Sequence, residues 1–306
     1  MTVKKILVTG SSGTVGTRLC EKLLEKEYEV HGADIVHNKW SKKVDNITKI
    51  VNLLDGKSFG KLGKDFDMVI HLAANARVYN LVKDPSKAFD NFQTLFNALE
   101  FCRKNNIKKF IFSSSREVYG NSEKMKYRED EADVRRCESP YTASKIGGEA
   151  LIYAYEKCYG IEPVIVRFSN VYGMYDESDR VVPLFIRMAM EEKTITIFGK
   201  EKELDFTYID DAIDGVLRCI ERFDSLKGDV YNIASGKAIT IEKVAEIIMK
   251  KMKKNNSIIM KDNRTGEVEK FVADTTKAEK ALGHKAVTGI EEGLEKSIQW
   301  YSKVLY

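Results

Sequence analysis

Short apolar runs alternate with helical patterns along the first half of the chain. The runs are rich in Val, Ile, Leu and Phe, and they occupy residues 4–10, 28–34, 47–54, 67–74, 108–115 and 162–170. Because they are apolar almost continuously, and not only at every second position, they are typical of strands that are covered on both faces, as in a parallel sheet.

The clearest helical pattern between these runs covers residues 86–105, where Phe89, Phe92 and Phe96 recur at helical spacing. A regular alternation of strands and helices predicts an α/β fold with a doubly wound parallel sheet of the Rossmann type and right-handed crossovers. The pattern becomes irregular after Asn170, which predicts a smaller, discontinuous second region.

The composition of the 306 residues is that of an ordinary soluble protein, with 43% hydrophobic and 31% charged residues. The net charge of +4 is small, and lysines alternate with acids, so we find no basic stripe for nucleic acid. No apolar run approaches the ~20 residues of a membrane span. The first strand begins so early that we expect no signal peptide.

Five cysteines lie far apart and lack the spacing of a metal site. We therefore expect no bound metal. Reduced and mostly buried thiols are the expected state, which is typical of a cytoplasmic protein.

The sequence VTGSSGTVG places Gly10, Gly13 and Gly16 directly after the first strand and into a helix. Glycines there allow a tight turn and a close backbone approach to a pyrophosphate, which the helix N-terminus attracts. Asp34 ends the second predicted strand, where a carboxylate would accept a hydrogen bond from a ribose 2′-hydroxyl and repel a 2′-phosphate. The pattern therefore predicts NAD in preference to NADP; a merely solvated Asp34 is the alternative.

Tyr141 and Lys145 lie four residues apart at the start of a helical stretch, SPYTASKIGGEA. That spacing puts both side chains on one helix face. A tyrosine has an ordinary pKa of about 10 and is a poor base at neutral pH, but a nearby ammonium and a cationic nicotinamide would favour the phenolate. Tyr141 could then take a proton from a sugar hydroxyl as hydride leaves the same carbon. Simple surface pairing of the two residues is the alternative.

With these residues, the chain resembles the extended short-chain dehydrogenases/reductases, in the NAD-dependent nucleotide-sugar epimerase/dehydratase family. The resemblance covers essentially the whole length. The motifs that carry it are TGSSGTVG (9–16), HLAA (71–74), SSSREVYG (113–120), YTASK (141–145), RFSNVYG (167–173), DFTYIDD (205–211) and RTGEV (264–268). It implies a NAD-binding domain of residues 1–170 and 206–237, and a nucleotide-sugar-binding region of residues 171–205 and 238–306.

The family also implies the cofactor contacts, residue by residue. The pyrophosphate and ribose would be surrounded by Gly10, Ser11, Ser12, Gly13, Thr14, Val15, Gly16 and Asp34, and adenine would contact Asn52 and Leu53. The groove would be lined by Leu72, Ala73, Ala74 and Asn91, and Ser169 would lie near the nicotinamide. The set of expected cofactor contacts is completed by Ser113, Tyr141 and Lys145. The family often has Asp at the position of Asn52, whose amide oxygen still accepts a hydrogen bond.

The resemblance also implies the substrate contacts, which lie between Ser115 and Phe271 in the sequence. Ser115 matches the hydroxyl donor to the reacting sugar oxygen, so Ser115, Tyr141 and Lys145 form the expected catalytic set. Asn170, Arg264 and the stretch 196–199, which includes Thr196 and Phe198, resemble the nucleotide-diphosphate site. The expected substrate contacts are completed by Arg116, Glu117, Arg180, Val181 and Phe271. The family pairs as a homodimer through the helices that hold residues 92–101 and 141–150.

The dipeptide Arg116-Glu117 bears on the reaction. Dehydratases of this family carry an Asp-Glu pair at this position, and an arginine cannot protonate a leaving hydroxyl, so dehydration is not expected. Glu117 matches the acid of UDP-glucuronate decarboxylases, which keeps that reaction open. A structural ion pair beneath the substrate is the interpretation that we favour slightly over catalysis.

Three other positions bear on the substrate. Leu204 replaces an arginine that usually touches the diphosphate in this family. Arg180 falls where related epimerases place a polar substrate contact. It could supply the second guanidinium for the diphosphate, bind a hexuronate carboxylate, or face solvent. Phe271 matches a position whose bulk limits the 2-substituent of the sugar, which disfavours N-acetyl sugars.

We therefore expect a 4-epimerase acting on UDP-glucose/UDP-galactose or on UDP-glucuronate/UDP-galacturonate through a transient 4-keto intermediate. A UDP-glucuronate decarboxylase and a 4-keto-sugar reductase are the alternatives among enzymes. A non-catalytic NAD-binding regulator is the alternative from another class of protein, although it would not need Ser115, Tyr141 and Lys145 together.

Overall fold

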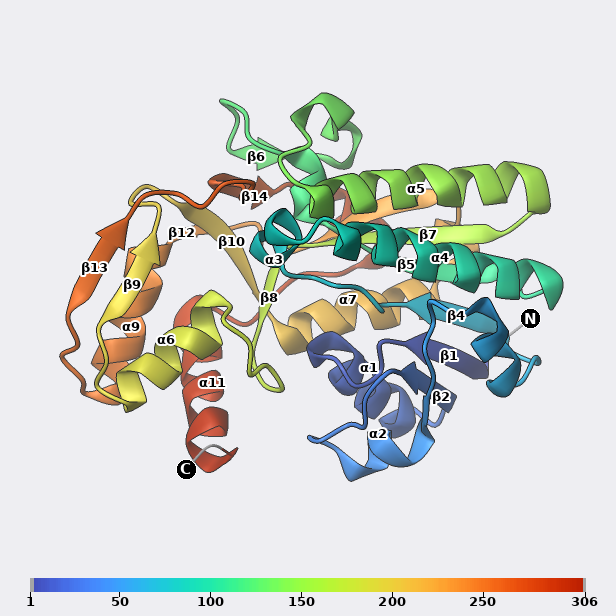
Figure 1. The fold of residues 1–306 in the computed structure, drawn as a ribbon, viewed down its shortest axis with the longest axis horizontal. Helices are drawn as coiled ribbons and strands as arrows, with labels where there is room; N and C mark the ends of the chain where they lie inside the picture. The colour runs from blue at the N-terminus through green and yellow to red at the C-terminus, as the bar shows by residue number, and fades with distance from the viewer. Residues whose placement is uncertain (1–2, 305–306) are drawn as a thin grey trace.

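The computed structural model describes residues 3–304 and contains a seven-stranded parallel sheet. Its strands lie in the order β11-β7-β5-β4-β1-β2-β3 (Figure 1). They are β1 (Lys5–Thr9), β2 (Glu29–Asp34), β3 (Thr48–Ile50), β4 (Met68–His71), β5 (Lys109–Ser115), β7 (Glu162–Phe168) and β11 (Asp229–Ile233). The order reverses between β1 and β4, so the expected doubly wound sheet is confirmed and its crevice lies at this switch point.

Alternate residues of the strands feed two separate cores. Ile6 and Val8 of β1 belong to one core together with Leu19 of α1, whereas Leu7 belongs to the other together with Leu95 of α4. Two covered faces explain why the apolar runs are continuous.

The helices that accompany this sheet are α1 (Thr14–Glu25), α2 (Lys42–Ile47), α3 (Val78–Lys83), α4 (Ser86–Lys104), α5 (Pro140–Tyr159), α7 (Ile209–Glu221) and α8 (Phe223–Leu226), with 3₁₀ turns η1 (Gly56–Lys61), η2 (Arg116–Tyr119), η3 (Glu129–Glu131) and η4 (Val134–Arg136).

The second region is built on a smaller sheet, in which β12, β10, β14 and β6 follow one another and β8 also pairs with β10. A separate ladder joins β13 to β9 at the far end of the molecule (Figure 1). The elements are β6 (Lys126–Tyr127), β8 (Asn170–Tyr172), α6 (Val181–Met190), β9 (Ile195–Phe198), β10 (Glu203–Tyr208), β12 (Ala238–Thr240), α9 (Ile241–Met252), β13 (Ile258–Lys261), β14 (Lys270–Ala273), α10 (Thr276–Leu282) and α11 (Ile290–Val304). The domain boundary expected at residue 206 falls inside β10, and the division into two domains stays a prediction.

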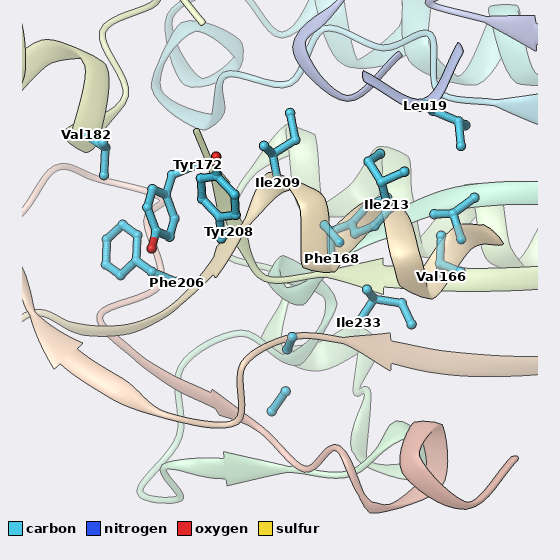
Figure 2. Close-up of a cluster of buried hydrophobic side chains, with 14 of the residues drawn as sticks. Leu19, Val166, Phe168, Tyr172, Val182, Phe206, Tyr208, Ile209, Ile213 and Ile233 are labelled. Atoms are coloured by element: carbon cyan, nitrogen blue, oxygen red, sulfur yellow. The ribbon is translucent and has the colours of Figure 1, made fainter. Parts of the chain in front are cut away.

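One apolar core continues from the large sheet into the second region. Figure 2 shows Leu19 of α1 and Ile213 of α7 at one end of this cluster, and Tyr172, Phe206 and Val182 at the other. All five side chains are buried. Because burial of each such side chain contributes about 1.5–3 kcal/mol, this shared core fixes α6 and β10 relative to the large sheet.

A buried ion pair joins three elements at the carboxyl end of the sheet. Arg167 of β7 donates to both carboxylate oxygens of Glu149 of α5, from Nε at 2.9 Å and from Nη2 at 2.7 Å. Glu149 also accepts from the Ser114 hydroxyl of β5 at 2.5 Å. Arg167 Nη1 in turn donates to the Glu129 carbonyl at 2.7 Å and to the Tyr119 hydroxyl at 3.0 Å. The pair therefore fixes α5 against the ends of β5 and β7.

Two surface features complete the fold. Phe89 and Phe96 of α4 remain exposed, on one of the two helices that would form the expected dimer contact; the single chain does not test that contact. Among residues 3–304, no helix is long and apolar enough to cross a membrane.

Replacing Arg167 by Met should destabilise the protein by about 3–5 kcal/mol, because the Glu149 carboxylate would stay buried without its cation. Urea unfolding followed by circular dichroism measures the change. Lys243→Met is the matched control, since it breaks the exposed pair with Glu246 and should change stability by no more than about 0.5 kcal/mol. A loss below about 1 kcal/mol for Arg167→Met would contradict the stabilising role of the pair.

Candidate active site

A cavity of about 540 Å³ opens at the carboxyl ends of β1, β4, β5 and β7. Ligands bind at this edge in doubly wound folds. Of the residues that the sequence predicts for the site, the cavity is lined by Gly10, Gly13, Thr14, Val15, Gly16, Leu72, Ala74, Ser113, Ser115, Arg116, Glu117, Tyr141, Ser169, Asn170, Arg180, Val181, Thr196, Phe198 and Arg264. The structure therefore brings most of the cofactor side and most of the substrate side to one space.

The turn between β1 and α1 has a shape that requires glycine. Gly10 has a φ of +76°, and a Cβ on it would lie 2.7 Å from the Ala73 nitrogen. A Cβ on Gly16 would lie 2.0 Å from the Gly10 carbonyl oxygen. Gly13 caps α1 without a side chain, so the first N–H groups of the helix stay open to an anion. These residues fit the pyrophosphate of a dinucleotide.

Asp34 ends β2 beside this turn, as expected. Its Oδ2 accepts from the Ser12 N–H at 2.8 Å, and its Oδ1 accepts from the N–H groups of Ile35 at 2.7 Å and Val36 at 3.2 Å. Burial raises the pKa of Asp34, and the three hydrogen bonds act in the opposite direction. The Ser12 hydroxyl donates to the Val36 carbonyl, so Ser12 shapes this corner through both of its polar groups.

Other expected cofactor residues lie behind the cavity wall. Ser11 is fully buried and its hydroxyl bonds Thr48 at 3.0 Å, so its side chain does not face a pyrophosphate. Asn52 caps the turn at Leu54 from an exposed position, and Leu53 is buried next to it. The roles of Asn52 and Leu53 at adenine stay predictions.

The loop after β4 forms the floor of the groove. Leu72 and Ala74 line the cavity, while Ala73 packs against Gly10. Asn91 is buried in α4 and exchanges hydrogen bonds with the backbone of Asn75, accepting at 2.6 Å and donating at 3.0 Å. Asn91 therefore positions this loop, and its own amide is already engaged.

Ser115, Tyr141 and Lys145 converge at the end of β5 and the first turn of α5. Ser115 and Tyr141 line the cavity, and the Ser115 hydroxyl accepts from the Glu117 N–H at 3.2 Å. Lys145 lies one helical turn behind Tyr141, where its Nζ donates to the Ser113 carbonyl at 2.6 Å and lies 5.8 Å from the centre of the Tyr141 ring. The predicted common helix face is confirmed.

Burial and charged neighbours act in opposite directions on Tyr141. Burial raises the pKa of Tyr141 overall, and the negative charge of Glu117 also raises it, whereas the Ser115 hydroxyl and the positive charges of Arg180 and Arg116 lower it. Burial lowers the pKa of Lys145 to about 8, so at neutral pH Lys145 still carries a positive charge. That charge favours the phenolate of Tyr141.

Arg116 and Glu117 form a buried ion pair, with 2.8 Å between Arg116 Nη2 and Glu117 Oε1. Burial raises the pKa of Glu117 and the Arg116 charge lowers it. Within the described residues, Arg116 Nη1 and Glu117 Oε2 have no hydrogen-bond partner. The Arg116 guanidinium also lies over the Phe271 ring, 5.7 Å from its centre.

Phe271 is 1% exposed and stacks on Tyr119 and Tyr127, with ring centres 5.6 Å and 5.8 Å away. It lies outside the cavity wall, behind Arg116. Its position therefore does not support the expectation that its bulk limits the 2-substituent of a sugar. The aromatic stack instead supports Arg116 from below.

The loop before α6 crosses one side of the cavity. Arg180 donates to the Asp176 carboxylate at 3.3 Å, and Asp179 pairs with Arg77 of the loop before α3. Tyr175 accepts from the Thr14 hydroxyl through its carbonyl at 2.9 Å. These contacts hold the loop against both the glycine turn and the floor, and Arg180 lines the same cavity as Tyr141.

Arg264 lies at another part of the cavity, between two aromatic rings. Its guanidinium is 3.9 Å from the centre of the Phe198 ring and 4.8 Å from the centre of the Tyr79 ring. Thr196 and Phe198 of β9 line the cavity here, as expected, and so does Leu204 of β10. Arginine held flat by rings keeps its N–H edge for planar anions.

Sequence analysis missed two residues of this wall. Lys202, directly before β10, lines the cavity and is 6% exposed. Its Nζ lies 2.5 Å from a carboxylate oxygen of Glu267, which also lines the cavity. The signal that could have found Lys202 is its place two residues before Leu204, because residues i and i+2 of a strand share a face.

Comparison with known proteins agrees with this geometry. Residues 6–234 match the model of the NAD dependent epimerase/dehydratase family. The chain is similar to the UDP-glucuronate 4-epimerase of Thermodesulfobacterium geofontis, with 30% identity over 96% of this chain and 95% of that protein.

Two solved structures have the same fold along the whole chain. One is the UDP-glucose 4-epimerase of Thermotoga maritima with UDP-glucose, which is 27% identical, has a TM-score of 0.90, and is matched over 99% of this chain and all of that one. The other is the UDP-glucuronic acid 4-epimerase of Bacillus cereus in complex with UDP-glucuronic acid and NAD, which is 29% identical with a TM-score of 0.90 and the same coverage.

The Asp34 carboxylate should make the protein bind NAD at least about tenfold more tightly than NADP, because like charges repel across a few ångströms. Asp34→Asn keeps one acceptor oxygen for the local N–H groups and removes the charge, so the difference should narrow. Calorimetric titration at about pH 8, well above the ordinary pKa of an aspartate, measures both affinities. Equal binding of the two cofactors by the wild type would contradict the role of Asp34.

Proposed function

Because the chain belongs to the NAD-dependent epimerase/dehydratase family, we propose that it is a UDP-sugar 4-epimerase. The observation that carries this proposal is the convergence of Ser115, Tyr141 and Lys145 on one cavity with the glycine turn. The two solved relatives that share the fold are themselves 4-epimerases of UDP-sugars.

The residues of the chain divide the chemistry between them. Tyr141 takes the proton of the sugar's 4-hydroxyl, and Ser115 holds that oxygen through its own hydroxyl. Lys145 stabilises the phenolate from behind the ring. Gly10, Gly13 and Gly16 would hold NAD, which when bound would supply the hydride acceptor, and in its reduced form the hydride donor, that the side chains lack.

Oxidation leaves a 4-keto sugar as an intermediate, and the hydride held by the bound cofactor would return to the other face of its carbon 4. Tyr141 then returns the proton to the oxygen, so atoms and electrons balance within one turnover. The sugar leaves as an isomer of unchanged mass, with no net oxidation. The reaction therefore needs no added reductant.

Glu117 is the feature that keeps a decarboxylase as the second candidate. Glu117 lies in the cavity wall and is only 4% exposed, and this burial raises the pKa of its carboxyl. Its ion pair with Arg116 supports the structural interpretation. Arg116 takes the place of a proton donor and argues against a dehydratase.

We propose neutral hexose and hexuronate as the sugar classes to compare, since one of the relatives acts on each. Arg180 bears on this choice because it lines the same cavity as Tyr141 and its charge acts on the Tyr141 phenol, which supports a contact with the sugar. We propose that Arg180 contacts the sugar, where a hexuronate carboxylate is the group that a guanidinium binds best.

Incubation with UDP-glucose or UDP-glucuronate, without added reductant, should yield an isomer of unchanged mass, identified by liquid chromatography and mass spectrometry. Tyr141→Phe should lower turnover by about 10²–10⁴-fold and leave NAD binding intact, because the phenol acts as a base. Loss of carbon dioxide from UDP-glucuronate would identify a decarboxylase, accumulation of free NADH would exclude a closed redox cycle, and near wild-type turnover by Tyr141→Phe would exclude the acid–base role.

Arg180→Ala should weaken UDP-glucuronate binding by at least about tenfold, the value of one charge-assisted contact, and leave UDP and UDP-glucose nearly unchanged. Calorimetric titration of the three ligands gives the comparison, and Arg135→Ala, on a side chain that is 86% exposed, is the control. An equal loss for all three ligands would assign Arg180 to the diphosphate. Unchanged affinity throughout would leave it a solvated arginine.

A further inference from the structure

Lys202 is a dehydrated cation in the wall of the cavity. It is 6% exposed, and it lines the cavity directly before β10. Lysine is almost never buried unless it is paired, and removing its ammonium from water costs free energy that a partner must offset. The partner in the structure is Glu267, at 2.5 Å.

The Glu267 carboxylate uses only part of the hydrogen-bonding capacity of the Lys202 ammonium. A lysine has three N–H donors, and within residues 3–304 Glu267 is the acceptor found for Lys202 Nζ. The backbone of Lys202 is fixed independently, since its N–H donates to the Gly199 carbonyl at 3.2 Å and its carbonyl accepts from the Ile241 N–H at 3.1 Å. The side chain can therefore turn its remaining donors to a ligand without moving the strand.

Strand alternation places Lys202 on the same side as Leu204. Residues i and i+2 of a strand point to one face, and both residues line the cavity. Leu204 can offer an anion no hydrogen bond. The positive charge of this face of β10 therefore comes from Lys202.

Lys202 and Arg264 flank the same carboxylate. Glu267 lies 2.5 Å from Lys202 Nζ and 4.0 Å from Arg264 Nη1, so two cations surround one anion. The guanidinium of Arg264 stacks between rings, and within the described part of the chain no hydrogen bond from it is found. The cluster of Lys202, Arg264 and Glu267 therefore has a surplus of positive charge and of unused donors.

Arg180 lies at a different part of the cavity. Its charge acts on Tyr141, and its guanidinium is held by Asp176 at 3.3 Å. Lys202 and Arg264 instead flank Glu267. Arg180 therefore belongs to a different ion pair in the cavity wall from that of Lys202 and Arg264.

We propose that Lys202, together with Arg264, binds the diphosphate of the nucleotide sugar, and that Lys202 supplies the cation that Leu204 lacks. The inference rests on the proposed function, because it takes a nucleoside diphosphate as the ligand. Glu267 holds the ammonium in place before binding, and its single charge leaves the cluster attractive to a dianion. A structural ion pair alone would not need to face the cavity.

Calorimetric titration of UDP and of uridine against the NAD-loaded protein tests this assignment. Lys202→Gln removes the charge while its amide can still donate to Glu267, and it should weaken UDP binding by about ten- to a hundredfold. Uridine lacks phosphates, so its affinity should stay within about twofold. Lys202→Arg should recover most of the UDP affinity, and Lys200→Gln, on an exposed lysine two residues earlier, should behave like the wild type.

The outcomes separate this proposal from the proposed function. Wild-type affinity for UDP in Lys202→Gln would overturn the role of Lys202 and leave the epimerase intact, whereas failure of the wild-type protein to bind UDP at all would overturn the nucleotide-sugar function itself. An equal loss for uridine and UDP would show damage to the pocket and overturn the phosphate contact. If Lys202→Gln fails to fold, Lys202→Arg tests the role of Lys202 instead. UDP affinity within about threefold of the wild type would support a contact that depends on charge, whereas loss of UDP affinity would show that the site depends on the packing of lysine and would overturn the proposal.

Discussion

The buried pair of Arg167 and Glu149 is the interaction on which the geometry of the site depends. It joins β7 to α5, and the Ser114 hydroxyl joins the same carboxylate to β5. Ser115 follows Ser114, and α5 carries Tyr141, so the distance between the Ser115 and Tyr141 hydroxyls is set by this pair. The buried Glu149 carboxylate can join three elements in this way only while the positive charge of Arg167 compensates its own charge.

The cavity shows a consistent use of acids as holders of cations. Asp176 holds Arg180, Glu117 holds Arg116, and Glu267 holds Lys202. Each pair limits the cost of dehydrating a positive charge, and each leaves N–H donors for a ligand. A site that is arranged in this way attracts a negatively charged substrate without carrying a large net charge in its absence.

Local signals in the sequence were enough for the strands, the glycine turn and the Tyr141–Lys145 pair, because each depends on spacing within one element. The domain limits were harder, since the core of Figure 2 runs through both regions. Phe271 was placed at the sugar, but its stacking on Tyr119 and Tyr127 depends on contacts between distant segments. Lys202 was missed because its burial and its pairing with Glu267 depend on a segment that is distant in the sequence.

Asp34 illustrates what the fold contributes to cofactor binding beyond charge. Three backbone N–H groups fix both of its oxygens, so the rotamer of the carboxylate is selected when the chain folds. Ordering a side chain on association costs about 0.5–1.5 kcal/mol, and here that entropy is lost before any ligand arrives. The ribose hydroxyls would therefore bind to a preorganised acceptor, and this preorganisation would increase the affinity for the cofactor without adding a contact.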